Sequence, residues 1–591
     1  MGTNYVKKSR TVRLPIATST KINQFSNGAS TERGSYILNG IILKYPDEKL
    51  YVTQRPTITS AYDPDDIPIT VDRGRGIYYW DDTGVGQYVE ETYWTPETYA
   101  EGSDTPALFI VNGPEIYKGS YATVTTGATI TTGTTRLYMA ELGADLVFAD
   151  PENNEMWYVS TGTATVLKTM TFAAVTESCV FADANPDTIT TTSTWSPLMV
   201  AGDVFKVSGT TLNEGTYTVA SHSGTLITLV AGDALAAETI SCTLTPYGAL
   251  PQNNSRSLAH GIVTLDQTMY VLATDGTVWG STIGNAKKWT DALNVITAER
   301  EEDQGVFITK HFEHIVIFGR RTIEFMYDAG NPTGSPLAVR QDIAYNVGCA
   351  DPNSVWRYED EVYFLGRNAS GQVQVYRLKD FKIEPISTST LSTFFTQTGY
   401  TYVGSGFQAG GNTFYVLSVG DSSSGDMVSK ETHVYNATTN SWTEWDYSGA
   451  DPDKFPMISA TSVGVDSTGY GQFTNGLIFT LTDTLVPSED SVDLTMTIRS
   501  DHFDADSRDW KYAHQLRFVG DATAASQNIT IKWADDSNAS YSTGRTIDIS
   551  NSNNKLTRLG RFKSRSHQVD YSGSEQIRIE GLDLDVSEGT H

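Results

Sequence analysis

Aspartate clusters are the feature of this sequence that comes closest to a catalytic pattern. They occur in "DPDD" at 63–66, "DADSRD" at 504–509 and "DLD" at 583–585. Glycosidases use two such carboxyl groups, one to protonate the leaving group and the other as base or nucleophile. The spacing in 504–509 also suits calcium, but that stretch lacks the glycine and the terminal glutamate of an EF-hand loop. Turns and solvated loops explain aspartate clusters without any chemistry, so we expect no catalytic or metal site here.

The histidines, cysteines and glycine-rich stretches do not complete a catalytic or cofactor motif. No GxSxG elbow is present, and "GSGFQAGG" at 404–411 lacks the GK[ST] ending of a phosphate-binding loop. In "HFEH" at 311–314 the two imidazoles are three residues apart, and in an alternating strand they would point to opposite faces. Cys179, Cys242 and Cys349 show no CxxC spacing; the first two could pair, although two buried thiols are the simpler expectation. We therefore expect a protein without enzymatic activity, cofactor or metal.

Basic residues gather in two stretches of an otherwise acidic chain. The sequence has 42 Lys and Arg against 70 Asp and Glu, a net charge of -28, which argues against general nucleic-acid binding. The acidic excess suits either a solvated surface or a wall past which DNA slides without adhering. A local reversal of charge favours docking on an acidic protein neighbour or on DNA phosphates, and the alternative is a solvated strand face. The candidate assembly residues are Lys7, Lys8, Arg10, Arg13, Arg558, Arg561, Lys563 and Arg565.

The sequence shows no signal for membrane insertion or secretion. No run of about 18 apolar residues occurs. The N-terminal stretch "MGTNYVKKSRTVRLP" lacks the apolar core of a signal peptide. We expect a soluble chain that is not exported by the usual signal.

A recurring phrase of strand, short turn and aromatic strand organises the chain. It is found in "TMYVLATDGTVWGST" from 268, "HIVIFGRRTIEFMYD" from 314, "EVYFLGRNASGQVQVYRL" from 361 and "NTFYVLSVG" from 412. Aligning Tyr270, Val316, Tyr363 and Tyr415 gives spacings of 46, 47 and 52 residues. Four short strands and their turns need roughly 40 to 50 residues, the length of one β-propeller blade. With weaker echoes on either side, we predict an all-β propeller of about six to eight blades, with aromatic residues packed between neighbouring blades.

Two regions interrupt this period and divide the chain into five segments. A Thr-, Val- and Ala-rich stretch at 162–248 predicts a β-sandwich inserted between blades. Alternating apolar residues over 490–591 predict a second β-sandwich outside the propeller. The polar residues 1–35 predict an arm that adds nothing to the core. The blades then occupy 36–161 and 249–489.

Several stretches resemble the packaged-DNA stabilisation proteins of short-tailed bacteriophages, also called tail hub or nozzle proteins. The resemblance rests on "IFGRRTIEFMYDAGNPTGSPL" from 317, "DSRDWKYAHQLRFVG" from 506 and "LTRLGRFKSRSHQVDYSGSEQIRIEGLDLDV" from 556. It covers most of residues 260–591, and the N-terminal third matches less well. The stretch 162–248 resembles the small β modules that decorate phage tail proteins.

This resemblance implies a structural protein of the virion tail. Six copies would form a ring beneath the portal and a tail adaptor protein, retain the packaged DNA and provide the channel for its ejection. Tail fibre or needle proteins would be further neighbours, the genomic DNA would pass without sequence-specific binding, and synthesis would take place in the host cytoplasm. The alternative is a carbohydrate-binding or glycoside-hydrolysing β-propeller at a phage tail tip, which would gather carboxylates and aromatic residues at one face.

Overall fold

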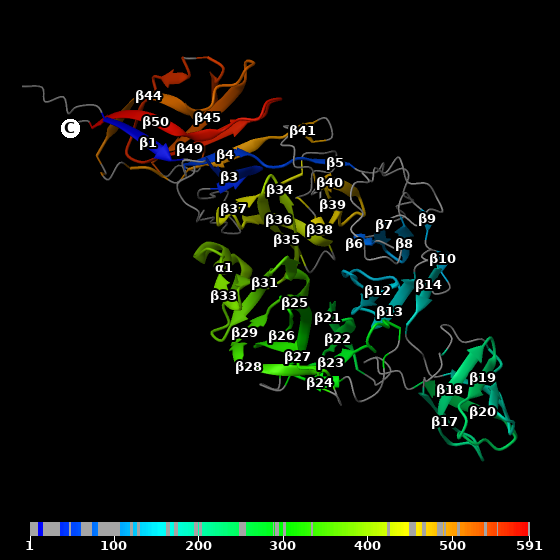
Figure 1. The fold of residues 1–591 in the computed structure, drawn as a ribbon. Coiled ribbons are helices and arrows are strands. Elements are labelled where there is room, and N and C mark those ends of the chain that lie inside the picture. The colour runs from blue at the N-terminus through cyan, green and yellow to red at the C-terminus, as the bar shows by residue number, and fades with distance from the viewer. Residues whose placement is uncertain are drawn as a thin grey trace, which may run out of the picture. The chain divides into compact units, whose positions relative to one another are not determined.

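The described part of the chain is almost entirely β-structure. A computed structural model describes residues 10–15, 36–45, 49–60, 74–80 and, with shorter gaps, 107–588 (Figure 1). Two compact units are present: unit 1 holds 1–64, 372–377 and 384–591, and unit 2 holds 65–371 and 378–383. Among the described residues, α1 (Ser389–Phe395) is the one α-helix and η3 (Pro352–Ser354) is a 3-10 turn. The all-β class expected from the sequence is confirmed.

Four antiparallel meanders make up most of unit 2, and each places four strands side by side in chain order. The first is β6 (Gly74–Trp80), β7 (Ala107–Asn112), β8 (Glu115–Lys118) and β9 (Ala122–Thr123). The second is β11 (Tyr138–Leu142), β12 (Asp145–Asp150), β13 (Glu155–Ser160) and β14 (Val166–Thr169), with β10 (Thr125–Thr126) parallel to β14. The third is β21 (Leu258–Leu265), β22 (Thr268–Ala273), β23 (Thr277–Gly280) and β24 (Val295–Thr297). The fourth is β25 (Gly305–His311), β26 (His314–Gly319), β27 (Ile323–Asp328) and β28 (Leu337–Tyr345).

The same pattern continues along the chain into unit 1. β29 (Val347–Cys349) and β30 (Trp356–Tyr358) pair with β31 (Glu361–Asn368), and β32 (Val373–Lys379) and β33 (Lys382–Pro385) follow at the boundary of the units. A meander of unit 1 contains β34 (Tyr400–Ala409), β35 (Asn412–Asp421), β36 (Asp426–Asn436) and β37 (Ser441–Glu444). Another contains β38 (Met457–Val463), β39 (Thr468–Phe473) and β40 (Ile478–Leu481). β5 (Ile58–Ser60) pairs with β40, so a strand from the start of the chain completes this last meander.

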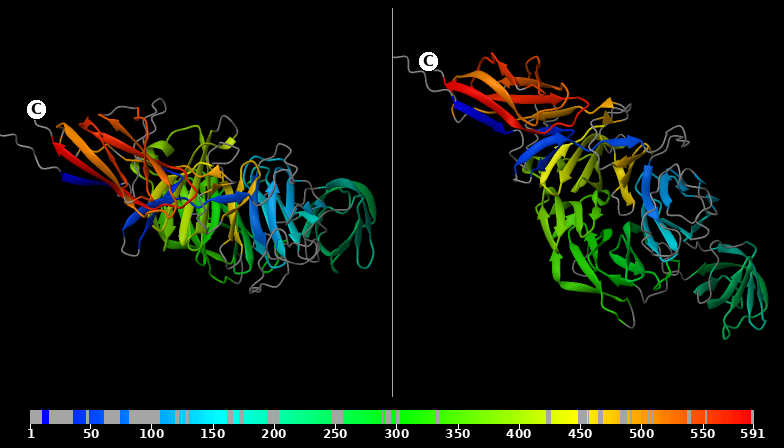
Figure 2. Two further views of the ribbon diagram at one scale, coloured as in Figure 1. Left: turned by 90° about the horizontal axis from the view of Figure 1, so that it is seen from above. Right: turned by 45° about the horizontal axis from the view of Figure 1, so that its top comes forward.

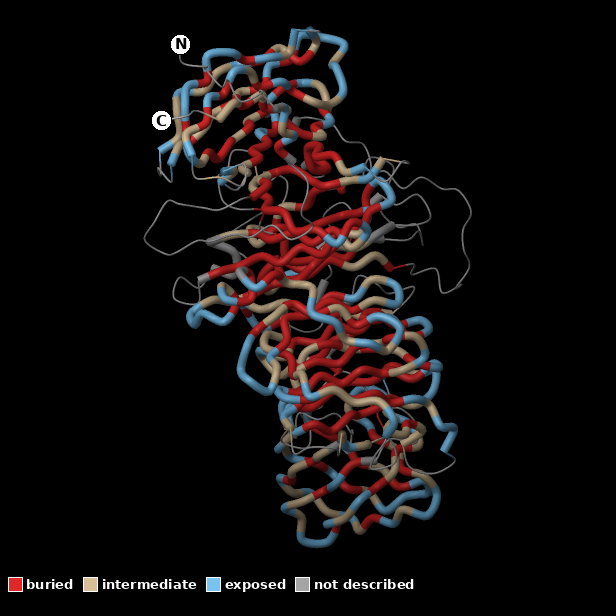
Figure 3. Tube along the Cα trace, turned by 90° about the vertical axis from the view of Figure 1, so that its left-hand side faces the viewer, coloured by how far each residue is buried: buried red, intermediate tan, exposed pale blue. Residues whose placement is uncertain are grey.

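Alternate side chains of one strand pack against different meanders, which explains the sequence repeat. In β12, Leu146 and Phe148 belong to the core shared with β7 and β8, whereas Val147 and Ala149 belong to the core shared with β21 to β23. A sheet buried on both faces needs a neighbour on each side, as propeller blades have. Figure 3 shows the result: buried residues follow the strands, and exposed residues follow the turns. The four aligned positions, each at most 1% exposed, are Tyr270, Val316, Tyr363 and Tyr415.

The inserted segment forms a closed barrel, where the sequence predicts a sandwich of two sheets. Its strands pair in the order β15-β16-β19-β18-β17-β20. Figure 2 shows the strands of this segment in teal. The long strand β20 pairs with both β15 and β17, so no free edge separates two sheets. Cys179 and Cys242 are buried free thiols of this barrel, and burial raises the pKa of both. The strands are β15 (Val175–Ala182), β16 (Thr188–Thr190), β17 (Val204–Ser208), β18 (Gly215–Ser223), β19 (Leu226–Leu229) and β20 (Glu238–Pro246).

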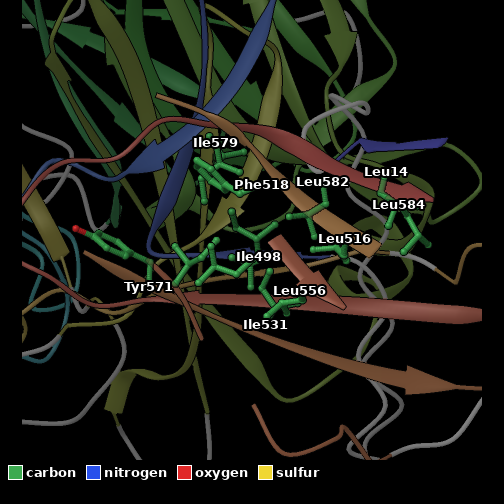
Figure 4. Close-up of a cluster of buried hydrophobic side chains, with 14 of the residues drawn as sticks. Leu14, Ile498, Leu516, Phe518, Ile531, Leu556, Tyr571, Ile579, Leu582 and Leu584 are labelled. Atoms are coloured by element: carbon green, nitrogen blue, oxygen red, sulfur yellow. The ribbon is translucent and has the colours of Figure 1, made fainter. Parts of the chain in front are cut away.

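The C-terminal part of unit 1 is a sandwich of two sheets around one apolar core. Leu516 and Phe518 contribute to this core from one sheet, and Ile498 and Ile531 contribute from the other (Figure 4). One sheet has the order β3-β4-β50-β44-β47, with β1 beside β50 and β48 beside β44. The other runs from the β34–β37 meander through β2 into β43, β49, β45 and β46. A separate pair, β41 (Ser488–Glu489) and β42 (Val492–Asp493), precedes it. The strands are β1 (Arg10–Pro15), β2 (Tyr36–Leu38), β3 (Gly40–Lys44), β4 (Leu50–Gln54), β43 (Met496–Arg499), β44 (Lys511–Gly520), β45 (Asn528–Asp535), β46 (Arg545–Asp548), β47 (Lys555–Thr557), β48 (Arg561–Phe562), β49 (Arg565–Tyr571) and β50 (Ile579–Glu588).

The N-terminal segment contributes to this core, contrary to the expectation of an arm outside it. β1 pairs with β50 along its whole length. Its alternation is the physical reason, because Val12 and Leu14 pack on the core while Thr11 and Arg13 are directed outward. Leu14 is only 4% exposed. The rest of the predicted arm, 1–9 and 16–35, lies outside the described residues.

Candidate assembly interface

The sheet that contains β1 brings the two basic stretches of the sequence to the same end. Arg10 lies opposite Val586 on β50, and Val586 lies opposite Ala513 on β44. At the other edge of β44, Tyr512 pairs with Arg561 of β48. Neighbouring strands are about 4.8 Å apart, so three strand spacings, or about 14 Å, separate the backbones of Arg10 and Arg561. The fold therefore joins two clusters that lie at opposite ends of the sequence.

An aromatic ring supports two exposed cations at this end of the sheet. Arg561 Cζ lies 4.7 Å and Lys563 Nζ lies 5.1 Å from the centre of the Trp510 ring. Each such contact is worth about 0.5–1 kcal/mol at an exposed site, so Trp510 restricts two long side chains. Tyr512 is 45% exposed and lies beside Arg561 on the same face of the sheet. Trp510, Tyr512, Arg561 and Lys563 are called the cationic-aromatic patch below.

Arg13 and Arg558 are exposed as well, but the charge of Arg13 is partly neutralised. Arg13 Nε donates to Asp583 Oδ1 over 2.9 Å, and Arg13 NH1 lies 3.8 Å from Glu580 Oε2. The hydrogen bond to Asp583 raises the pKa of Arg13. Arg558 lies in the turn between β47 and β48, where its φ is 60°. The predicted cations outside the described residues are Lys7 and Lys8.

Arg565 is the predicted interface residue that lies inside the sandwich. Its side chain is 1% exposed and donates to both oxygens of Asp535, over 2.5 and 2.9 Å. The guanidinium also lies over the Phe562 ring, with Cζ 4.4 Å from its centre. This placement follows from alternation along β49, in which Arg565, Val569 and Tyr571 all point inward. In the sequence, Val569 and Tyr571 lie four and six residues after Arg565, so all three face the same side of one strand. This alternation indicated that Arg565 faces the core, but the prediction from charge alone did not use it.

The histidines of "HFEH" are arranged differently from the prediction that they point to opposite faces. His311 and His314 flank a two-residue turn between β25 and β26 and are register partners, so their rings lie on one face. Each ring centroid is 4.9 Å from that of Phe381. His311 Nε2 accepts a hydrogen bond from the backbone N–H of Phe381 over 3.2 Å. Burial lowers the pKa of both histidines, so they act as neutral packing partners at pH 7.

The aspartate cluster at 583–585 serves local structure. Asp585 accepts a hydrogen bond from Thr11, as Asp583 does from Arg13, and both hold β1 on β50. The cluster at 63–66 lies outside the described residues. An open hollow of about 620 Å³ beside β26 to β28 has one carboxylate in its lining, Asp342, whose Oδ1 lies 3.0 Å from Arg340 Nε.

In the part of the chain that the structure describes, no helix is long and apolar enough to cross a membrane.

A family model described as "Phage_stabilise: Bacteriophage P22 Gp10, beta-propeller" matches residues 190–403. The resemblance to this family is confirmed. The matched stretch starts at the end of β16 in the barrel, contains the third and fourth meanders of unit 2, and ends in β34. The meanders therefore have a propeller-type arrangement, and residues 190–403 are similar to the phage-stabilisation family.

Solved structures similar to this chain share little sequence with it. The computationally designed protein Ika8 is 8% identical over 72% of this chain and 99% of its own, with a TM-score of 0.30. BamB from Moraxella catarrhalis is 11% identical over 63% of this chain and 93% of its own, with a TM-score of 0.27. An exo-beta-1,3-galactanase from Phanerochaete chrysosporium is 10% identical over 78% of this chain and 97% of its own, with a TM-score of 0.23. Similarity at this level does not extend to function, and no curated protein sequence matches the chain.

Proposed function

We propose that this chain is the repeating subunit of the tail nozzle of a short-tailed phage, in which a ring of six copies retains packaged DNA and provides the channel for its ejection. The match of residues 190–403 to the phage-stabilisation family is the observation that carries this proposal. A closed ring of identical subunits needs two different, complementary surfaces on each copy. The cationic-aromatic patch has the character of one of them, because it is basic, aromatic and ordered.

The charge of the chain supports both the assembly and the channel. At a net charge of -28, most surfaces of a neighbouring copy are acidic, so a local group of Arg and Lys is complementary to them. An adaptor ring with an acidic face would be recognised in the same way. Acidic side chains along a channel repel DNA phosphates only at close range, because the Debye length is about 8 Å at physiological salt. DNA can then pass without adhering and without sequence-specific contacts.

The ring has further neighbours in the tail. The tail adaptor binds above it, and fibre or needle proteins bind elsewhere on the tail. The chain is made in the host cytoplasm and then joins the virion. Neither catalysis nor a cofactor is required for these roles.

The assembly surface is tested by reversing two charges of the cationic-aromatic patch. The variant R561E/K563E should assemble into rings, or be incorporated into tails, at least about tenfold less than wild type, since like charges across an interface cost several kcal/mol. Arg561 and Lys563 are exposed, so the variant should fold with the circular dichroism spectrum of the wild type, and the loss of both contacts with Trp510 should lower its melting temperature by only a few degrees. Ring formation is measured by light scattering and electron microscopy, and incorporation by quantifying the chain in purified particles.

A matched variant separates the patch from the total charge. K206E/K382E changes the net charge equally at exposed lysines of β17 and β33 and should assemble like wild type. Equal assembly by both double variants would contradict the proposed interface. Hydrolysis of a surface glycan by the purified chain would instead support the carbohydrate-active alternative.

A further inference from the structure

Glu431, His433 and Glu444 form a compact group of metal-ligating side chains on one meander of unit 1. Glu431 and His433 are two residues apart on β36 and therefore face the same side of the sheet. Glu444 on β37 is the register partner of His433. One ligand atom from each residue lies within 4.8 Å of those from the other two. We propose that these residues bind a divalent transition-metal ion, with Zn²⁺ as the expected occupant.

The distances within this group suit a zinc ion. Two ligands that are each about 2.1 Å from a tetrahedral ion lie about 3.4 Å apart. Glu431 Oε2 and His433 Nε2 are 3.5 Å apart, so this pair is already at the required separation. The ligand atom of Glu444 lies within 4.8 Å of the other two, so a change in its side-chain torsion angles can bring it in as the third ligand, and water fills the remaining position. Zn²⁺ binds well to both imidazole nitrogen and carboxylate oxygen. Mn²⁺ binds mainly to carboxylate oxygen, so the histidine in this group favours Zn²⁺.

Burial makes a divalent cation a better partner for this group than a proton. His433 and Glu444 are 2% and 5% exposed, and the Glu431 side chain is 18% exposed. The rings of Phe394 and Phe395 meet the His433 ring edge-on, with centroids 5.5 and 5.7 Å away. Two carboxylates in such an apolar setting are costly unless their charge is offset. A protonated imidazole offsets one of the two charges, and a divalent ion offsets both.

The helix that carries these two phenylalanines is fixed over the site. Thr388 caps α1, because its side-chain oxygen accepts a hydrogen bond from the backbone N–H of Leu391 over 3.3 Å. Trp442 of β37 donates its Nε1–H to the carbonyl of Ile386 over 2.8 Å, which ties the segment before α1 to the same meander. Ligands held by such supporting contacts need little rearrangement to bind an ion. The ion would join β36 to β37 beneath α1, so its role would be structural and independent of the proposed nozzle.

Metal uptake by the untagged full-length chain tests the inference. The protein is stripped with a chelator, dialysed against Zn²⁺ or Mn²⁺, and analysed by mass spectrometry of the metal and by titration calorimetry. We expect one Zn²⁺ per chain, weaker binding of Mn²⁺, and a higher melting temperature of the zinc-loaded protein. X-ray absorption at the zinc edge should show only nitrogen and oxygen ligands, at about 2.0–2.2 Å.

Substitutions that keep side-chain shape locate the ion. E431Q and E444Q should each bind Zn²⁺ at least about tenfold more weakly than wild type, whereas E384Q, at an exposed glutamate of β33, should bind like wild type. Absence of stoichiometric uptake by the wild type overturns the proposal, as does unchanged affinity in both site variants. If E444Q does not fold, E431Q decides alone, because Glu431 lies at the more exposed edge of the group.

Discussion

Replacing His567 by leucine should stabilise the C-terminal sandwich and reduce its sensitivity to acid. His567 on β49 is 2% exposed, and neither of its ring nitrogens has a hydrogen-bond partner among the described residues. Burial, and to a smaller extent the charges of Arg565 and His502, lowers the pKa of His567 to about 3. An unsatisfied buried polar group costs about 1–3 kcal/mol, and leucine fills a similar volume without this cost. H567L should therefore be more stable than wild type by about that amount at pH 8.

The pH dependence follows from the difference in His567 pKa between the folded and unfolded chain. An unfolded histidine titrates near pH 6.5, so between about pH 6.5 and 3 the unfolded state binds a proton that the folded state does not. The stability associated with neutral His567 is complete above pH 6.5 and is lost as the pH falls toward 3. At pH 5 this difference favours the unfolded state by a factor of about 30, which corresponds to about 2 kcal/mol.

Unfolding by denaturant at pH 8 and pH 5 measures the effect. The free-energy advantage of H567L over wild type should grow by about 2 kcal/mol between the two pH values. H514L is the matched control, because His514 is exposed on β44 of the same sandwich and its Nε2 contacts Ser587 Oγ. Its difference from wild type should not change with pH in this way. An H567L advantage that stays constant between pH 8 and pH 5 would refute a buried neutral imidazole.

Three further substitutions examine packing in both units. D150A should lower the free energy of unfolding of unit 2 by about 3–5 kcal/mol, because it leaves the fully buried Arg75 without the carboxylate 2.6 Å from NH2; a loss in denaturant melts below about 1 kcal/mol would argue against this pair. G348A should lower the melting temperature, because a Cβ at this position would lie 1.9 Å from the backbone oxygen of Arg320, and calorimetry showing an unchanged transition would disprove the close approach. L14A should cost about 2–5 kcal/mol in chemical denaturation if β1 is part of the sandwich core, and no cost would mean that β1 is detached in solution.

The meanders were predictable because their sequence signal is local. Strands buried on both faces are rich in apolar and aromatic residues throughout, as in β22, where all six residues are buried. Turn residues such as Gly276, with a φ of 86°, separate consecutive strands at short intervals. Each meander repeats this order of apolar strands and turn residues. Aligned positions such as Tyr270 and Val316 could therefore be found without knowing the fold.

Strand pairing between distant parts of the chain was not predictable from these local signals. Alternation shows that β1 has an apolar face, but nothing in its six residues specifies β50 as its partner. The same holds for β20, whose length allows it to close a barrel or to form the edge of a sandwich. His311 and His314 were misjudged for a related reason, because Phe312 adopts a φ of 49° and converts one apparent strand into a hairpin.

The pairing of β1 with β50 makes the candidate interface depend on the complete sandwich. Arg10 on β1 and Arg561 on β48 reach the same end of the sheet only because β50 and β44 lie between them. β2 adds a second link, since it pairs with β37 of a meander and with β43 of the sandwich. A chain that has not yet folded its C-terminal strands therefore has exposed cations but no ordered cationic-aromatic patch. Assembly through this patch would select fully folded subunits, because preorganised side chains bind at a lower entropic cost than mobile ones.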